Sequence, residues 1–248
     1  YVAGICAFNA GMIKDCTNKG DISVVSNNTG GRHCRIGGIS LTSASGMYTA
    51  DDYGKTEPST DPVMSTILNQ SDGYFLNCTN SGDISVSNST DYRLTGLQIA
   101  GIVANVPAGT AETHARIENC HNTGNISHIE PVYKARNEAR AVAGIVACVG
   151  VHSPVDNSYT YGSDTISGPA LADIGFPAEI TGCTNTGTIT NGCYSNPNIN
   201  NEAIASYRRQ QSFTGGIVGY AHGLDASNVV KIEDCVNNAS MYVGARNV

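Results

Sequence analysis

The chain has 248 residues, of which 14% are charged and 6% aromatic, and a net charge of −7. An acidic chain without a basic stripe argues against nucleic acid or an anionic membrane surface as a partner. No apolar run approaches the roughly 20 residues that a membrane helix needs. Abundant Gly, Asn, Ser and Thr, together with β-branched residues, indicate an all-β protein of many short strands joined by turns.

The first recurring segment is a short apolar strand that reads small residue, Gly, Ile. Its Gly-Ile pairs are Gly4-Ile5, Gly38-Ile39, Gly101-Ile102, Gly144-Ile145 and Gly216-Ile217. The small residue and the Gly let neighbouring backbone approach, and we expect the Ile side chains to form one column in a shared core. Because the first copy begins at residue 3, we expect the chain to be a segment of a larger protein.

The second recurring segment reads Ile-x-x-Cys-x-Asn-x-Gly-x-Ile-Ser. Its copies start at Ile13, Phe75, Ile117, Ile180 and Ile232. The first Ile and the Cys are three residues apart, so they cannot both face inward along one flat strand, and a bend must lie between them. From the Cys onward, regular alternation predicts a strand, a tight turn at Asn-x-Gly and a second strand. Asn and Gly suit this turn because both tolerate left-handed backbone angles.

Equivalent residues of the second segment should stack in columns. The structural residues that we expect in these columns are Asn18, Asn80, Asn122, Asn185 and Asn237, and Cys16, Cys78, Cys120, Cys183 and Cys235. Stacked side chains point in parallel, so we expect the motif cysteines to be buried thiols that pack as small hydrophobes. The total of nine Cys is odd, and a disulfide that involves Cys34 or Cys193 stays open.

The spacing of the two segments predicts the fold. From the motif Gly to the motif Cys the distances are 12, 40, 19, 39 and 19 residues, whereas from Cys to the next Gly they are 22, 23, 24 and 33. One connection is nearly constant and the other swells, as in a solenoid whose insertions leave at one corner. We predict a single domain over residues 1–248, a right-handed parallel β-helix (β-solenoid) of about five rungs.

Two inserts interrupt this pattern, over residues 42–73 and 150–178. Loops on a rigid scaffold often carry binding, and Tyr together with Asp suits contacts to sugar or protein. The candidate ligand-binding residues of the inserts are Tyr48, Asp51, Asp52, Tyr53, Tyr159, Tyr161 and Asp164. Both inserts leave the same corner of alternate coils, so we expect them to lie near each other; the alternative is a polar covering without a ligand.

Metal and catalytic signatures are absent from the sequence. No CxxC pair provides zinc-ligand spacing, and no phosphate loop, dinucleotide fingerprint or nucleophile elbow occurs. We therefore expect no metal, no cofactor and no catalytic residue. The histidines, expected in solvated loops or outward strand positions, are His33, His114, His121, His128, His152 and His222. The acidic residues beside the motif cysteines, expected on a solvated face, are Asp15, Glu118, Glu233 and Asp234.

The pairing of Gly215–Gly219, which reads Gly-Gly-Ile-Val-Gly, with the Cys-x-Asn-x-Gly segment resembles the GLUG-type repeat. The resemblance covers nearly all of the chain except the inserts. It implies an exported β-helical stalk or adhesin, since such repeats belong to large proteins of gut and mucosal bacteria, including adhesin-like proteins and regions attached to IgA-cleaving metalloproteases. The chain departs from the pattern at Ser40, Phe75 and Ala239, and the last suggests a terminal copy.

These observations favour an exported, secreted or cell-surface adhesin or structural stalk and not an enzyme. We expect it to bind host or bacterial surface glycan or protein through its loops, as a monomeric segment of a longer chain. The main alternative is a polysaccharide-processing enzyme or tailspike-like β-helix, which would need two or three carboxylates about 5–9.5 Å apart. A passive spacer without a ligand is the third possibility.

Overall fold

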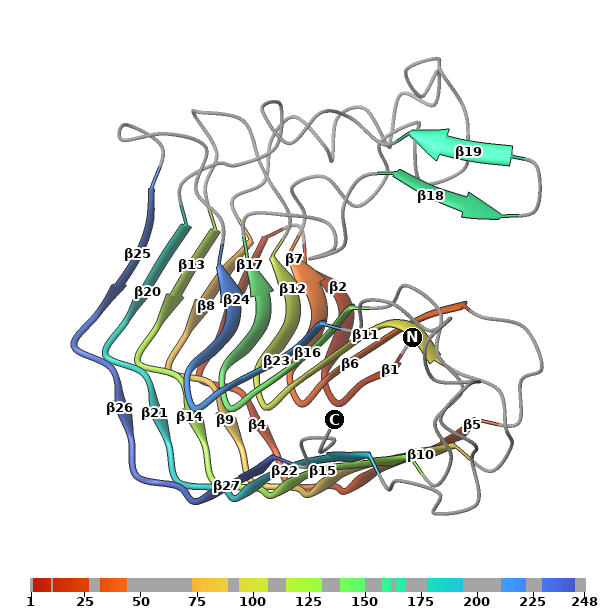
Figure 1. The fold of residues 1–248 in the computed structure, drawn as a ribbon. Coiled ribbons are helices and arrows are strands. Elements are labelled where there is room, and N and C mark those ends of the chain that lie inside the picture. Colours follow the sequence, from red (N-terminus) through yellow and green to blue (C-terminus); the bar gives the residue numbers. More distant parts are fainter. Residues whose placement is uncertain are drawn as a thin grey trace.

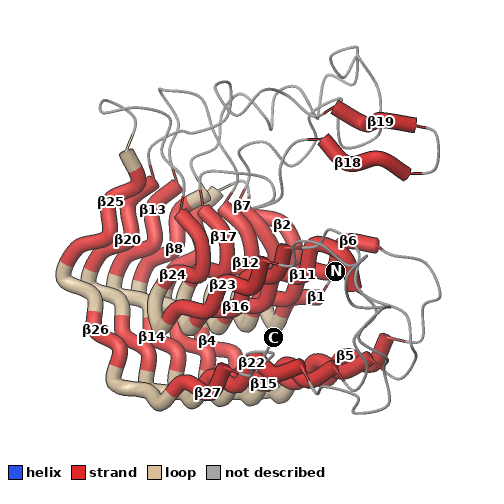
Figure 2. The backbone as a smooth tube through the Cα atoms, in the orientation of Figure 1, coloured by secondary structure: helices blue, strands red, loops and turns tan. Residues whose placement is uncertain are grey.

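The computed structural model describes residues 2–9, 11–26, 32–43, 73–88, 94–106, 115–130, 139–149, 158–161, 164–167, 178–193, 211–221 and 229–243. Within these ranges the chain forms 27 β-strands and no helix. Twenty-five strands build five parallel sheets of five strands each, and the other two form a hairpin (Figures 1 and 2). We call the parallel sheets A to E in the order in which the chain first visits them.

Each coil of the chain contributes one strand to every sheet, so strands that pair are one coil apart in the sequence. This cycle confirms the predicted parallel β-solenoid of five coils. In the fourth coil, the antiparallel hairpin of β18 (Ser158–Tyr161) and β19 (Asp164–Ser167) comes between the strands of sheets B and C.

Sheets A and B contain the small-Gly-Ile segment, with the Gly and Ile at the bend between them. Sheet A consists of β1 (Val2–Ala3), β6 (Arg32–Gly37), β11 (Leu94–Ala100), β16 (Ala139–Ala143) and β23 (Gln211–Gly215). Sheet B consists of β2 (Cys6–Asn9), β7 (Ser40–Ser43), β12 (Val103–Val106), β17 (Val146–Val149) and β24 (Val218–Ala221).

The Cys-x-Asn-x-Gly segment spans the other three sheets, and Figure 1 shows them running around the outside of the bend. Sheet C consists of β3 (Met12–Lys14), β8 (Tyr74–Leu76), β13 (Ala115–Glu118), β20 (Ala178–Thr181) and β25 (Val230–Glu233). Sheet D consists of β4 (Thr17–Asn18), β9 (Thr79–Asn80), β14 (His121–Asn122), β21 (Thr184–Asn185) and β26 (Val236–Asn237). Sheet E consists of β5 (Ile22–Ser26), β10 (Ile84–Asn88), β15 (Ile126–Glu130), β22 (Ile189–Cys193) and β27 (Met241–Val243).

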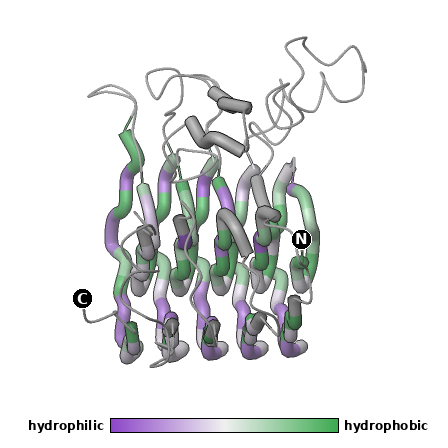
Figure 3. The backbone as a smooth tube through the Cα atoms, turned by 45° about the vertical axis from the view of Figure 1, so that its right-hand side comes forward, coloured by the Kyte–Doolittle hydropathy of each residue, from purple (hydrophilic) through white to green (hydrophobic). Residues whose placement is uncertain are grey.

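Equivalent positions of the repeat pair with each other, which is why short strands are enough to build regular sheets. Ile22, Ile84 and Ile126 are register partners in sheet E, and the backbone amide of each motif Ile at the A–B bend donates to the Ile of the next coil, as from Ile102 to Ile145 at 3.2 Å. The predicted Ile column is therefore confirmed. Figure 3 shows the same order from the side, with the hydrophilic turns at the bottom repeated coil after coil.

The core is divided into two lobes because the bend between sheets A and B projects into the interior of the coil. In one lobe, sheet B packs against sheet C around Ile117 and Val146. In the other, sheet A packs against sheet E around Ile99 and Ile126. A third, smaller cluster that includes Ala141 and Cys148 lies where the second face of sheet A meets sheet B.

Both inserts connect sheet B to sheet C. The first follows Ser43 at the end of β7 and precedes β8, and the second follows Val149 at the end of β17 and precedes β20. The predicted single corner for the insertions is confirmed, on the second and fourth coils. Whether the inserts touch each other concerns residues that lie mostly outside the described ranges.

Candidate functional site

The two repeat motifs meet inside the coil, where the Gly at the A–B bend lies against the Asn of sheet D. A Cβ atom built on Gly101 would collide with the carbonyl oxygen of Gly144 in the next coil and with the Asn122 side chain in its own coil. The same collision recurs at Gly4, Gly38, Gly144 and Gly216, each against the Asn of its own coil. The Gly of one segment and the Asn of the other therefore form a single packing unit.

The predicted Asn column is a continuous chain of hydrogen bonds. Asn18 donates through Nδ2 to Oδ1 of Asn80 at 2.8 Å, and the same bond links Asn80 to Asn122 (2.9 Å), Asn122 to Asn185 (2.8 Å) and Asn185 to Asn237 (2.8 Å). Each Nδ2 also donates to the carbonyl two residues later, as to Gly124 at 2.9 Å. Both amide hydrogens of the inner residues are thus used, which is what burial of an amide requires.

We expected Gly in the Asn-x-Gly turn because Gly tolerates left-handed backbone angles, and this explanation is wrong. Among the described residues, a positive φ occurs at neither the motif Asn nor the motif Gly. A Cβ on Gly124 would instead collide with the carbonyl oxygen of Gly82 in the previous coil, and one on Gly187 with that of Gly124. Gly is needed here because adjacent turns stack backbone on backbone.

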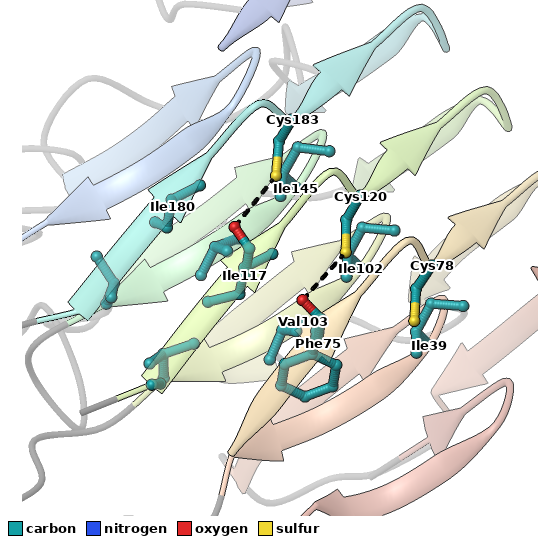
Figure 4. Close-up of a cluster of buried hydrophobic side chains, with 14 of the residues drawn as sticks. Ile39, Phe75, Cys78, Ile102, Val103, Ile117, Cys120, Ile145, Ile180 and Cys183 are labelled. Carbon is teal, nitrogen blue, oxygen red and sulfur yellow. Dashed lines mark hydrogen bonds between the residues drawn. The ribbon is translucent and has the colours of Figure 1, made fainter. Parts of the chain in front are cut away.

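The motif cysteines stack as thiols in the B–C lobe (Figure 4). All five are reduced, and Cys78, Cys120 and Cys183 are buried while Cys16 and Cys235, in the end coils, are half-buried. Each inner Sγ lies near a carbonyl oxygen of the preceding coil; the distance from Cys183 Sγ to Ile117 O, for example, is 3.4 Å. Buried reduced thiols are thus confirmed for the three inner coils. Cys34 is also reduced, whereas the side chain of Cys193 lies outside the described part.

The thiols of the stack have unequal pKa values, because hydrogen bonds with the Cys120 thiol lower the pKa of Cys78 to about 7 and also lower the pKa of Cys183. Hydrogen bonds with the Cys183 and Cys78 thiols, followed by burial, raise the pKa of Cys120 well above its usual range. Burial likewise raises the pKa of Cys235 and of Cys34. Because Cys78, Cys120 and Cys183 are buried among the apolar side chains of the B–C lobe, the stack serves packing.

The expected bend before the motif Cys is a single residue in the left-handed region. The φ angles are 54° at Asp15, 53° at Asn77, 49° at Asn119 and 53° at Asp234, and in the fourth coil Gly182 takes this place with 65°. Asp, Asn and Gly are the residues that adopt this conformation most readily. Their recurrence directly before the Cys is the sequence signal for this turn, whereas from the sequence we expected only a solvated face for Asp15 and Asp234.

The acidic residues beside the cysteines do lie on the outer face, but two of them have partners there. Asn77 Nδ2 donates to Asp15 Oδ1 at 2.9 Å, and the Tyr74 hydroxyl donates to Glu118 Oε2 at 2.6 Å. The bond to Glu118 raises the pKa of Tyr74. These carboxylates belong to contacts between coils.

The candidate ligand-binding residues fall on the inserts, mostly beyond the described ranges. Tyr48, Asp51, Asp52 and Tyr53 lie outside them altogether. Tyr159, Tyr161 and Asp164 lie on the β18–β19 hairpin, where the backbone register places Tyr161 opposite Asp164. The hairpin therefore brings two of the candidates to neighbouring positions at its turn.

A buried polar cluster in the A–E lobe was not anticipated. His128 of β15 is fully buried, and its Nδ1 lies 2.9 Å from Oδ1 of Asn191 in the next coil. Asn191 in turn donates to the hydroxyls of Ser212 at 3.1 Å and Thr214 at 2.9 Å. Our expectation of an outward or solvated position is wrong for His128, because its column in sheet E, shared with Val86, faces inward.

The hydrogen bonds of Asn191 show which ring nitrogen of His128 carries a proton. The amide Nδ2 donates to two hydroxyls, so Oδ1 is the atom that faces His128 and the imidazole must donate through Nδ1. The buried Arg140 lies beside Ser212 in the register of sheet A. The cluster thus replaces apolar packing in coils three to five with directed hydrogen bonds.

A second set of polar residues lies where sheets A and B pack against each other. Gln98 and Arg35 are register partners, and Asn105 continues the set on sheet B. In the fourth coil Cys148 occupies the position of Asn105, and burial raises its pKa to about 12. In the fifth coil the rings of Phe213 and Tyr220 lie 4.9 Å apart.

Within the described residues, no group of three or more His, Cys, Asp or Glu side chains is placed to hold a metal ion. The same part of the chain contains no helix long and apolar enough to cross a membrane. No family model matches the sequence, and no curated protein or solved structure matches it either.

Proposed function

We propose that this chain is a segment of an exported bacterial surface protein of the GLUG-repeat type, in which the solenoid is a stalk and the B–C corner carries an adhesive surface. Its ligand is a glycan or protein of a host or neighbouring cell, and no cofactor takes part. The resemblance of the repeat motifs supports the family, and the coil stack supports the stalk.

The observation that carries the proposal is the position of the two long inserts. Both lie between sheets B and C, while the connection from the motif Cys to the next Gly stays within 22–33 residues. Loops that share one corner of a rigid scaffold form a composite surface, which is how binding loops are commonly arranged. Tyr and Asp residues on these inserts suit hydrogen bonds and ring stacking with a sugar or a protein.

The coil positions themselves are committed to stacking. Ile39, Ile102 and Ile145 are fully buried, and the inner Asn and Cys columns are buried with them. Each coil buries its apolar side chains only against its neighbours, so these residues are required for stability. The loops are the part of the chain that is left for ligand contacts.

The proposal is tested by a glycan array and by binding to epithelial and bacterial cell surfaces. The intact chain is compared with a variant in which short Gly-Ser linkers replace residues 46–70 and 152–176. We expect binding by the intact chain and its loss in the variant, while the circular dichroism spectrum keeps its β-sheet form.

Equal binding by the variant would refute the inserts as the adhesive surface. Turnover of a glycan that disappears in Asp52→Asn or Asp164→Asn would instead favour the polysaccharide-processing alternative. Tyr161→Ala should weaken binding, and Tyr242→Ala, which changes an exposed Tyr on the outer side of sheet E, is the matched control.

A further inference from the structure

The outer face of sheet C carries a cluster of polar and aromatic side chains in coils two to four. Arg116 is the register partner of Tyr74 in the preceding coil and of Glu179 in the next. Glu118 follows Arg116 by two residues on the same strand, and therefore lies on the same face. Tyr74 and Glu118 are half-buried, and the side chains of Arg116 and Glu179 are 45% and 37% exposed. All four side chains point outward and can be reached by a ligand.

The Tyr74 ring lies along this face. Its hydroxyl donates to Glu118 Oε2 at 2.6 Å, and this acceptor lies one coil away and two residues further along the strand direction. A Tyr side chain that reaches so far across the sheet lies flat on it, with one ring face towards the sheet and the other towards solvent. A ring fixed in this way loses little freedom on contact and offers an apolar surface to the C–H side of a sugar ring.

The charged groups beside the ring suit the hydroxyls of a sugar. Arg116 Nε lies 3.9 Å from Glu179 Oε2, an ion pair that is longer than a hydrogen bond. A carboxylate accepts several hydrogen bonds through its two oxygens, and a guanidinium donates through a planar fork. Such groups match neighbouring sugar hydroxyls, which both donate and accept. Because two carboxylates surround one guanidinium, the cluster is acidic and disfavours a sialylated or sulfated sugar.

The cluster lies at the base of the two inserts. Tyr74 is the first residue of β8, which follows the first insert, and Glu179 is the second residue of β20, which follows the second insert. β13 lies between these two strands and contributes the other two side chains (Figure 1). The distance from β8 to β20 is two strand spacings, or roughly 10 Å, so a short oligosaccharide at the B–C corner can contact all three strands.

We propose that this cluster is a subsite for a neutral sugar, in which the Tyr74 ring stacks on the sugar and the Glu118 and Arg116 side chains bind its hydroxyls. The inference rests on the proposed adhesive function and narrows the ligand from a glycan or protein to a neutral glycan. It also adds residues of the rigid coil to a surface that otherwise consists of the inserts. The existing bond to Tyr74 is retained, because a carboxylate has acceptor sites for more than one donor.

The first experiment screens the intact chain on an array of neutral oligosaccharides and of their sialylated and sulfated forms. The neutral oligosaccharide with the strongest signal is then titrated by calorimetry. We expect binding to neutral oligosaccharides and at least about tenfold weaker binding to the anionic forms. Glu118→Gln and Arg116→Ala should each weaken binding of the neutral oligosaccharide by about tenfold or more, because hydrogen bonds to charged groups are the strong ones.

The second experiment separates the ring of Tyr74 from its hydroxyl. Tyr74→Phe keeps the ring and removes the bond to Glu118, whereas Tyr74→Ala removes both. If the ring stacks on the sugar, Tyr74→Ala weakens binding by about tenfold and Tyr74→Phe by less than about threefold. A purely structural Tyr74 would show its effect in urea denaturation and leave the affinity of both variants equal to that of the intact chain.

The matched control is Asp83→Asn. Asp83 is also an exposed carboxylate that bonds the next coil, since its Oδ1 accepts from the Asn125 backbone amide at 2.7 Å, but it lies at the turn between sheets D and E. This variant should bind the neutral oligosaccharide like the intact chain. Circular dichroism checks that each variant is folded, and Glu118→Gln and Tyr74→Phe, which preserve side-chain size, decide the case if Tyr74→Ala unfolds.

The inference is overturned if the intact chain binds no neutral oligosaccharide, or if Glu118→Gln and Arg116→Ala bind it as tightly as the intact chain. Binding to a protein alone also overturns it. Its failure differs from failure of the adhesive inserts. Loss of binding in the linker variant, with no change in Glu118→Gln, removes only this subsite. Loss of binding in Glu118→Gln, with binding retained in the linker variant, supports the subsite and removes the inserts as the adhesive surface.

Discussion

Gly101 shows how close packing fixes a residue without any demand on its φ angle. An added methyl group would overlap the carbonyl oxygen of Gly144 and the Asn122 amide, and neither the backbone nor the bonded amide can move aside. We expect Gly101→Ala to lower the free energy of unfolding by about 2–3 kcal/mol through overpacking, measured by urea denaturation.

The matched control for this change is Gly192→Ala, at a Gly of sheet E where an added methyl group would meet open space. There the substitution should be neutral or should stabilise the fold by about 0.5 kcal/mol, since Ala has less freedom to lose on folding. Equal losses at both positions would contradict the packing explanation.

The thiol column provides a chemical test at the same scale. Cys120 is fully buried with a raised pKa, so alkylation of the native protein should be slow at this residue and fast in denaturant. Cys16 and Cys235 in the end coils are half-buried and should be labelled first. Peptide mapping by mass spectrometry after timed labelling gives the order, and early labelling of Cys120 would refute a closed core.

The buried thiol of Cys148 should lower the free energy of unfolding at alkaline pH. Its pKa is raised from 9.0 to about 12 by burial, so in the folded protein the thiol keeps its proton while the unfolded chain ionises. The stabilisation is complete below pH 9 and decreases as the pH rises from 9 towards 12. Cys148→Ala should therefore show a flatter decline of the unfolding free energy over this range than the unsubstituted chain, and parallel curves would contradict the assignment.

At the scale of the element, the turn between sheets C and D depends on one left-handed residue per coil. Asn119 has φ of 49°, and Gly182 takes the same place one coil later. Asn119→Ala should cost about 1 kcal/mol because a Cβ without a local polar group disfavours this region, whereas Asn119→Gly should restore most of the loss. Thermal unfolding of the three proteins is the measurement; an equal cost for Ala and Gly would locate the effect in the amide group and not in φ.

The elements also show how far the sequence alone leads. The strands, the Asn-x-Gly turn and the insertion corner follow from the spacing of the two segments, because stacking forces each copy to repeat the same residue types. The two-lobed cross-section does not follow from it. Gln98 and Ile99 alternate like any strand with one buried face, yet both are buried, since sheet A is covered on its second face by sheet B, and no local pattern reports that contact.

A contact that no local sequence pattern reports also explains why the burial of His128 and the role of the Gly columns were not predicted. Polarity suggests an outward side chain for His128, whereas the hydrogen bond to Asn191, which lies 63 residues away, favours burial. Gly in a turn suggests a special φ angle, whereas the contact with the neighbouring coil decides the case here. In both instances the cause is a partner one coil away, which a sequence window does not contain.

For the whole molecule, stability is shared between coils because each one contacts only its neighbours. Contacts between equivalent strands, such as β11 with β6 and β16, join the coils in a line. In a linear array the inner units have two neighbours and the end units have one, so the same substitution costs less at an end.

The Ile column at the A–B bend tests this directly, because it offers the same residue in different coils. Ile102→Asp places a carboxylate in a fully buried position and should lower the free energy of unfolding by about 3–5 kcal/mol. Ile5→Asp changes the equivalent residue in the first coil, which is 44% exposed, and should cost about 1 kcal/mol because the carboxylate can reach water. Urea denaturation of both variants gives the comparison. Since the column aligns the two residues through backbone hydrogen bonds, equal costs would mean that the coils do not contribute according to their number of neighbours, and the linear picture of the fold would have to be abandoned.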